Sequence, residues 1–358
     1  MSKPFLLSRV LLRFNSEAED LLGELSAVAL TPDGSLWLGS DEFLSVERLS
    51  LIEPCIYGEH EPFAIGDFVE LFNQDDEIDI EGMDYADHYL WLTGSHSTKR
   101  KKAKGKTAAK DIARLSTIKT EPNRYLLTRI PVFGKELFKT CSHPDNPDEQ
   151  LTAACLQKTD QGNILIDALA EDEHLGPFLT FPLPSKENGF DIEGLAVRGD
   201  RVFLGFRGPV FRGWAIILEI EVEEKEPGIL TLKEIGKEGR CYKKHFVQLN
   251  GLGVRELCLK EDDLIILAGP TMDVEGSMQV FRLKNALDRS EDTISSQESG
   301  ELEVMFDLPF IPGTDHAEGL ALFACLGQSD SLLVVYDSPD ESRKVESNAI
   351  YADVFRLQ

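Results

Sequence analysis

The stretch IEGMDYADHYLWLTGSHS, residues 80–97, contains two short apolar segments separated by a polar turn. A small residue follows a glutamate at its start, and the second segment ends in glycine and polar residues. Short apolar segments joined by a tight turn are typical of antiparallel β-hairpins. The same pattern recurs at residues 25–42, 151–172, 192–209, 249–270 and 317–339. The sequence therefore predicts six related hairpins.

Further strands follow most of these hairpins. A third strand is predicted in SVERLSL, DIARLST, AIILEIEV, MQVFRLK and DVFRLQ, and a fourth in YLLTRIPV, LTLKEIG and VMFDLPF. The copies start roughly 40 to 70 residues apart, which suits one four-stranded propeller blade each. We therefore expect an all-β fold, a six-bladed β-propeller of four-stranded antiparallel blades, as a single domain over residues 1–358. A seven-bladed ring or two β-sandwiches are the alternative architectures.

The two ends of the chain indicate how the ring closes. The C-terminal DVFRLQ matches the third strand of the preceding copy, so the last blade lacks a fourth strand. The segment LLSRVLLRF at residues 6–14 has the character of that fourth strand. We expect it to complete the last blade and cover an open sheet edge. Two insertions are expected, a basic loop at 99–110 and an acidic loop at 285–302.

The composition limits the partners that the chain can bind. The formal net charge is −26, which disfavours binding of nucleic acid or an anionic membrane and favours cations or a basic partner. No apolar run is long enough to span a bilayer, and the N-terminus lacks the pattern of a signal peptide. We therefore predict a cytoplasmic protein with no nucleic-acid or membrane partner.

Alignment of the six copies places one residue of each at the same position of an inner strand. These residues are Ser26, Glu81, Thr152, Glu193, Asn250 and Glu318, and each is followed by a small residue. Converging carboxylates repel each other unless a cation, raised pKa values or hydrogen bonds compensate them. Oxygen ligands favour Ca²⁺ or Mg²⁺. The predicted metal ligands are therefore Glu81, Glu193, Glu318 and Asn250, although the glutamates could instead pin neighbouring blades through hydrogen bonds.

Polar residues on neighbouring loops are expected around the mouth of the central channel. The candidate ligand-binding residues are Asp41, His96, Asp191, Arg207, His316 and Asp337. They predict a site for a small-molecule or peptide ligand. The basic loop, with seven basic residues between Lys99 and Lys110, either covers a phosphorylated ligand or is a solvated loop attracted to its acidic rim.

Two segments, DIEGMDY…LTGSHS (79–97) and DIEGLAV…FLGFRGP (191–209), resemble an uncharacterised bacterial family, domain of unknown function 3616, common in cyanobacteria. More distantly, the chain is similar to the esterase-like phytase propellers, which share DxEGL-type inner strands. The resemblance implies a propeller and favours phosphoester hydrolysis, but it supplies no catalytic residue. Two functions are open: a divalent-metal-dependent hydrolase of phosphate or related esters at the channel mouth, or a non-catalytic ligand- or protein-binding scaffold.

Overall fold

Five inner strands form a closed ring in the described part of the chain. The structure is a computed structural model that describes residues 6–16, 18, 20–181 and 183–357. The inner strands are β2 (Leu25–Leu30), β6 (Ile80–Ala86), β17 (Asp191–Arg198), β22 (Gly253–Lys260) and β27 (His316–Leu322). Each packs against the next in this order, and β27 packs against β2. This arrangement around a central axis is that of a β-propeller.

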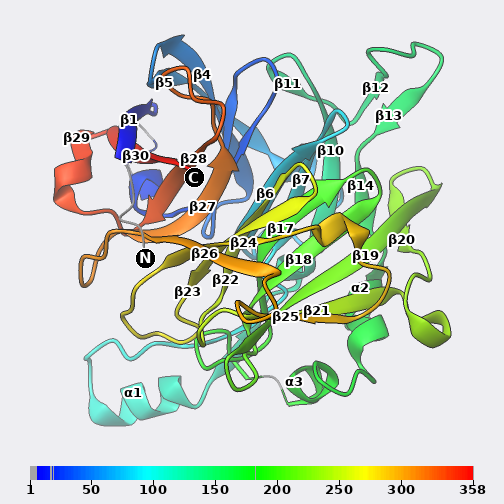
Figure 1. Cartoon of the computed structure of the whole chain (residues 1–358). Coiled ribbons are helices and arrows are strands. Elements are labelled where there is room, and N and C mark those ends of the chain that lie inside the picture. The colour runs from blue at the N-terminus through cyan, green and yellow to red at the C-terminus, as the bar shows by residue number, and fades with distance from the viewer. Residues whose placement is uncertain (1–5, 17, 19, 182, 358) are drawn as a thin grey trace.

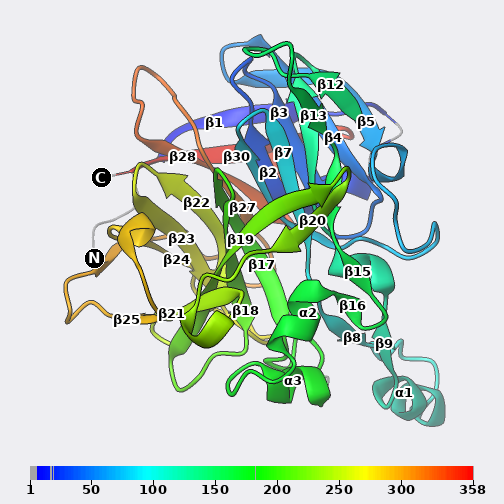
Figure 2. The same cartoon turned by 90° about the vertical axis from the view of Figure 1, so that its right-hand side faces the viewer.

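Each inner strand begins an antiparallel sheet that extends outward (Figures 1 and 2). The first sheet continues with β3 (Leu36–Ser40), β4 (Ser45–Glu53) and β5 (Ile56–Ala64), and the second with β7 (Tyr89–Gly94), β10 (Leu127–Phe133) and β14 (Ala154–Leu156). The third contains β18 (Arg201–Gly208), β19 (Trp214–Glu226), β20 (Ile229–Leu232) and β21 (Tyr242–Gln248). The fourth contains β23 (Asp263–Gly269), β24 (Gln279–Leu283) and β26 (Leu302–Asp307), and the fifth β28 (Ser331–Asp337), β30 (Ala349–Arg356) and β1.

The six-blade count is not confirmed, because the third predicted copy, residues 151–172, is not a blade. Its first residues belong to β13 (Gln150–Thr152), which pairs with β12 (Thr140–Ser142) instead of joining the ring. The next segment, β14, is an outer strand beside β10. The predicted second strand is helix α2 (Ile164–Leu169), because Asn163 caps it by accepting hydrogen bonds from two backbone N–H groups. Thr152 therefore holds no place among the inner strands.

The third and fourth strands of the second copy were also assigned wrongly. The segment DIARLST lies mostly in helix α1 (Ala108–Leu115), whose first turn is capped by the Thr107 side chain. The predicted fourth strand, YLLTRIPV, contains the third strand, β10, which pairs directly with β7. Helix α1 stands between the short strands β8 (Thr98–Arg100) and β9 (Ile118–Thr120), which pair with each other. In both views the insert projects from one side of the molecule (Figures 1 and 2).

The N-terminal strand closes the fifth sheet, as the sequence predicted. Strand β1 (Leu6–Arg13) pairs antiparallel with β30 and also makes a short parallel contact with β5 of the first sheet. Figure 1 shows this blue strand beside the red C-terminal strand. Val10 and Leu12 are buried there. The two ends of the chain thus meet within one sheet and connect the first sheet to the last.

The remaining elements are short. They are α3 (Gly176–Thr180), β11 (Glu136–Leu137), β15 (Lys158–Thr159), β16 (Gly162–Asn163), β25 (Thr293–Ser295) and β29 (Lys344–Glu346). Within the described ranges, no helix has the length and apolar character needed to span a membrane.

Small residues after the glutamates let the inner strands approach closely. A side chain at Gly82 would meet the Leu195 Cβ at 2.7 Å, and one at Gly194 would meet the Leu257 Cγ at 2.8 Å. This crowding confirms the sequence-based reason for small residues at these positions. Because Gly82 and Gly194 lie at these close contacts, the glutamates directly before them, Glu81 and Glu193, also have defined positions on the inner strands.

Candidate functional site

A β-bulge interrupts the pairing of each inner strand with its second strand. The residues at these interruptions are Ser26, Glu81, Glu193, Arg255 and Glu318. A bulge leaves a residue unpaired and redirects its side chain. Glu81, Glu193 and Glu318 line one cavity of about 850 Å³. The bulges therefore bring the three predicted glutamates together from three different sheets.

Asn250 does not belong to this set. It is exposed in the turn before β22, with a φ of 58°, and its Nδ2 donates to Gln279 Oε1 at 3.1 Å. The equivalent position is Arg255, in the segment Val254-Arg255-Glu256-Leu257. Glu256 follows Arg255, so this segment lacks the small residue of the repeat pattern. Asn250 is followed by Gly251 and therefore matched the pattern instead. The bulge at Val254/Glu256, which places Arg255 at this position, is a feature of strand register that the sequence does not mark.

Arginine side chains compensate the converging acids, a possibility that the sequence analysis did not include. Arg207 Nη1 lies 2.7 Å from Glu193 Oε1, and Arg255 Nε lies 2.9 Å from Glu193 Oε2. Arg255 also donates to Glu318. Both oxygens of Glu193 are thus engaged by guanidinium groups. The predicted set of four metal ligands does not fit this arrangement, since Asn250 is elsewhere and Glu193 is already paired.

A third arginine comes from a segment that sequence reasoning did not select. Arg124 lies in the short 3-10 helix Pro122–Tyr125, and it is buried. Its Nη1 lies 2.7 Å from Asp79 Oδ2, and its Nη2 lies 2.6 Å from Glu77 Oε1. No repeat or motif marks Arg124, because only the path of the chain after the basic insert brings it to the cavity.

Several acids in the cavity lack a close cationic partner. Glu81 has no hydrogen bond or ion pair with any described residue. Both carboxylate oxygens of Asp191 are buried without a hydrogen-bond partner, and its nearest cation is Arg207 Nη1 at 3.6 Å. Asp191 is only 1% exposed. Asp41 Oδ1 is likewise buried without a hydrogen-bond partner. Glu81, Asp191 and Asp41 therefore each offer a carboxylate oxygen to a ligand in this cavity.

Burial raises the pKa of the cavity acids. Burial and the neighbouring Glu193 raise the pKa of Glu81 well above its usual value and that of Asp191 to about 8. Burial raises the pKa of Glu318 to about 7, although Arg255 opposes the shift. Burial and the nearby Asp79 raise the pKa of Asp41 to about 9. These shifts favour the protonated forms of the cavity acids, and groups for acid–base chemistry often have pKa values shifted in this way.

The basic insert lies over the mouth of the same cavity. Lys99, Arg100, Lys101, Lys102 and Lys104 all line it. Lys99 pairs with Glu121 at 2.6 Å, and Arg100 Nη2 pairs with Glu187 at 2.9 Å. The ammonium groups of the other three lysines make no ion pair with the residues that the structure describes. The rim is therefore cationic above a floor of acids and arginines.

Four of the six predicted ligand-binding residues line this cavity, namely Asp41, Asp191, Arg207 and Asp337. His316 stands beside them, with its Nδ1 3.7 Å from Asp337 Oδ2, and Asp337 raises the pKa of its imidazole. His96 is buried outside the cavity lining. Its Nδ1 donates to the Gly94 carbonyl oxygen at 2.9 Å, while its Nε2 accepts from Asn163 Nδ2 at 2.8 Å. Burial lowers the His96 pKa to about 4, so this ring is neutral, and its two hydrogen bonds hold it in the protein interior.

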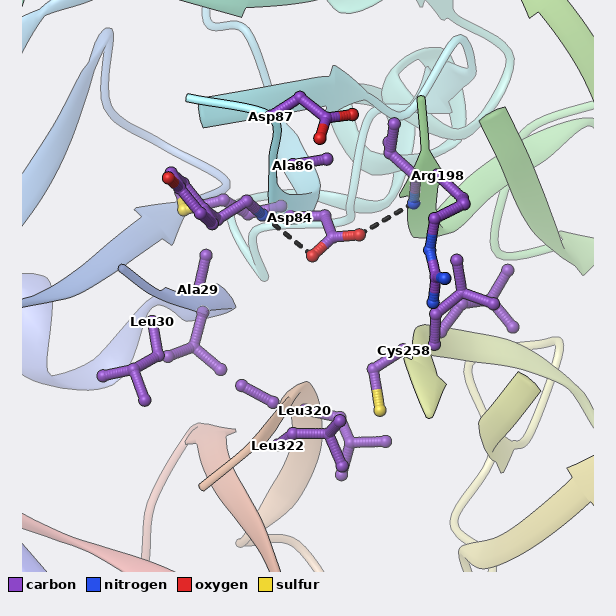
Figure 3. A pocket seen from close by; sticks show the side chains of 16 residues that line it. Ala29, Leu30, Asp84, Ala86, Asp87, Arg198, Cys258, Leu320 and Leu322 are labelled. Atoms are coloured by element: carbon purple, nitrogen blue, oxygen red, sulfur yellow. Dashed lines mark hydrogen bonds between the residues drawn. The ribbon is translucent and has the colours of Figure 1, made fainter. Parts of the chain in front are cut away.

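A second cavity, of about 370 Å³, lies at the other end of the inner strands (Figure 3). Its lining is mostly apolar and includes Cys258 and Leu320, with Asp84 pointing into it. Asp84 accepts hydrogen bonds from the backbone N–H groups of Tyr85 at 2.8 Å and Val197 at 2.7 Å. Burial raises its pKa to about 7. Asp84 therefore ties β6 to β17.

Comparison with known proteins places the chain in a family. A sequence model described as "Protein of unknown function (DUF3616)" matches residues 24–353, in agreement with the resemblance of the two quoted segments. No curated protein matches the chain.

Two solved structures illustrate the likeness in fold. The PQQ-bound form of aldose sugar dehydrogenase from Streptomyces coelicolor has 11% identity and a TM-score of 0.39, covering 99% of this chain and 100% of that chain. Virginiamycin B lyase from Staphylococcus aureus has 9% identity and a TM-score of 0.38, covering 98% of this chain and 99% of that chain. At these values neither structure carries an argument about the activity of this chain.

Proposed function

Because the chain belongs to the DUF3616 family, described only as of unknown function, we propose an activity from the cavity itself: hydrolysis of small phosphate esters or related esters. The observation that carries this proposal is that lysines and buried carboxyl groups of raised pKa line the same cavity. Lys101, Lys102 and Lys104 line its mouth, while Glu81 and Asp191 line its interior. Such a site can hold an anion and supply protons at the same time.

The cationic rim supports an anionic substrate. The chain as a whole carries a charge of −26, so its surface repels anions at long range. The three lysines without carboxylate partners, together with Arg207 on the floor, offer a local exception. Arginine and lysine bind phosphate oxygens through charge-assisted hydrogen bonds. A phosphate group held between the rim and Arg207 would place its ester bond beside the acids.

The cavity acids suit two different roles in ester cleavage. Burial and Glu193 raise the pKa of Glu81 well above its usual value, and its side chain has no hydrogen bond or ion pair with the described residues. Both features favour its protonated form, which can donate a proton to the leaving oxygen. Glu318, whose pKa burial raises to about 7, can accept a proton from the attacking water. Arg207 and Arg255 keep Glu193 in place between these two groups.

A divalent cation is a second way to neutralise the same acids. Ca²⁺ or Mg²⁺ would bind to Glu81 and Asp191, which both have unengaged oxygens in the cavity, instead of the set predicted from the sequence. When bound, the ion would polarise the ester oxygen and lower the pKa of water. We also propose, from the sequence, a distant relationship to the phytase propellers. We further propose that the protein acts in the cytoplasm.

The test is a screen of small phosphate esters with purified protein, with and without EDTA. We expect phosphate release by the wild type and a loss of about 10²-fold or more in kcat for Glu81→Gln, which removes the proton donor. A loss of activity in EDTA that added Mg²⁺ or Ca²⁺ restores would establish the metal form. Conversion of the screened esters at equal rates by wild type and Glu81→Gln would refute the role of Glu81.

A binding scaffold without catalysis is the second candidate, favoured by one observation. Arg255 joins Glu193 of β17 to Glu318 of β27 across three neighbouring inner strands, which is a structural role for the glutamates. In this form the lysine rim alone recognises the ligand. Binding of phosphate esters without turnover, weakened when Lys101, Lys102 and Lys104 are replaced by Ala, would favour it. Replacement of Lys225, Lys237 and Lys260, which lie outside the cavity lining, is the matched control.

A further inference from the structure

We infer that His88, His143 and Asp145 form a binding site for a divalent transition-metal ion of the zinc class. One possible ligand atom from each residue lies within 4.8 Å of the other two. The three residues do not line the 850 Å³ cavity, so this site is separate from the proposed hydrolase site. It is the one group of this kind found among the described residues.

The three side chains already contact one another. His88 Nε2 lies 3.3 Å from Asp145 Oδ2, and the two imidazole rings meet edge to face with centroids 4.8 Å apart. The Asp145 backbone N–H donates to His143 Nδ1 at 3.1 Å. This hydrogen bond restrains the His143 ring within its loop and leaves its Nε2 for a metal ion. Little movement is needed to bring three ligand atoms around one ion.

The ligand types indicate which ion fits. Two imidazoles and one carboxylate match the three protein ligands of open zinc sites, whereas Ca²⁺ and Mg²⁺ prefer oxygen ligands alone. Four-coordinate zinc would keep its fourth position for water, since Asp145 has a side chain that is 80% exposed. The anionic character of the chain favours the approach of a cation.

The positions of the ligands indicate what the ion does. His88 lies in the turn between β6 and β7, next to Asp87, which Figure 3 shows at the second cavity. His143 and Asp145 lie in the loop between β12 and β13. That hairpin pairs with no inner strand. An ion held by both loops would fasten the hairpin to the second sheet.

The test is zinc binding to the full chain after removal of metal with a chelator. We expect the wild type to bind one Zn²⁺ at this site, and His88→Asn and His143→Ala each to lower the affinity by about tenfold or more. Asn is used at position 88 because its φ is 68°, a left-handed conformation that Asn tolerates. His174→Ala is the matched control, since His174 lies 3.6 Å from a carboxylate oxygen of Glu173 but belongs to no such group.

A second readout separates ligation from folding. In the wild type, Zn²⁺ should slow amide hydrogen exchange across residues 140–152, and His143→Ala should lose this protection while keeping its melting temperature without metal. No zinc uptake by the wild type, or equal affinity in the wild type and both ligand variants, would overturn the site. A fall in affinity for His174→Ala as large as that for His88→Asn would also overturn it.

Discussion

Arg255 holds the acid ring together at the level of single residues. Its guanidinium is 7% exposed and contacts Glu193 and Glu318 from two neighbouring inner strands. Removal of one partner from a buried charge network leaves the other charges unpaired, which costs about 3–5 kcal/mol. We therefore expect Arg255→Gln to lower the free energy of unfolding by about that amount, as measured by urea denaturation. Lys225→Gln, which breaks an exposed pair with Glu223, should change it by less than about 0.5 kcal/mol.

Asp84 should make the stability depend on pH. Burial raises its pKa to about 7, whereas the unfolded chain ionises it near its usual value of about 4. Between these values the folded state holds a proton that the unfolded state has lost. The free energy of unfolding should therefore fall as the pH rises from about 4 to 7.

The measurement is the free energy of unfolding of wild type and Asp84→Asn over this range. The variant lacks the titrating group, so its free energy of unfolding should fall less steeply with pH. The difference in slope should correspond to about one proton released on unfolding. The cavity acids are unchanged in both proteins and contribute equally. Parallel slopes for the two proteins would show that Asp84 ionises normally in the folded state.

At the scale of elements, the hairpins could be predicted from the sequence and two helices could not. β6 and β17 are each a short apolar run followed by a tight turn, and the local sequence specifies this pattern. The run Ile164–Leu169 is equally apolar, but Asn163 caps it as a helix. Arg124 and Arg255 joined the site only through the path of the chain and the bulge register. Periodicity alone does not encode those contacts.

The cap at Asn163 provides a prediction at this scale. Its Oδ1 accepts from the backbone N–H of Leu165 and Ile166, and its Nδ2 donates to His96 and to the Tyr125 carbonyl oxygen. We expect Asn163→Ala to cost about 1–2 kcal/mol of stability in chemical denaturation. Thr107→Ala removes the cap of the exposed helix α1 and should leave global stability within about 0.5 kcal/mol. Equal losses in the two variants would contradict the role of the buried cap.

For the whole molecule, a hairpin-like segment counts as a blade only where its first strand packs among the inner strands of the ring. Six segments carry the same apolar pattern, but only five of them pack side by side around the axis. Residues 154–156 form β14, which pairs with β10 of the second sheet and, in parallel, with β20 of the third. The N-terminal strand completes the last sheet and connects it to the first. The sequence identified this strand because the last blade lacked a fourth strand.

Closure through β1 should therefore control the stability of the entire ring. Leu12 is completely buried between Ile350 of β30 and Tyr57 of β5, so it joins the last sheet to the first. Leu12→Ala leaves a cavity at this junction and should cost about 2–5 kcal/mol in urea denaturation. Leu6→Ala, in the same strand but 43% exposed, should cost less than about 0.5 kcal/mol. Because the ring unfolds as one unit, the denaturant slope should be unchanged in both variants. A small effect of Leu12→Ala with a reduced slope would instead mean that β1 detaches before the remaining sheets unfold.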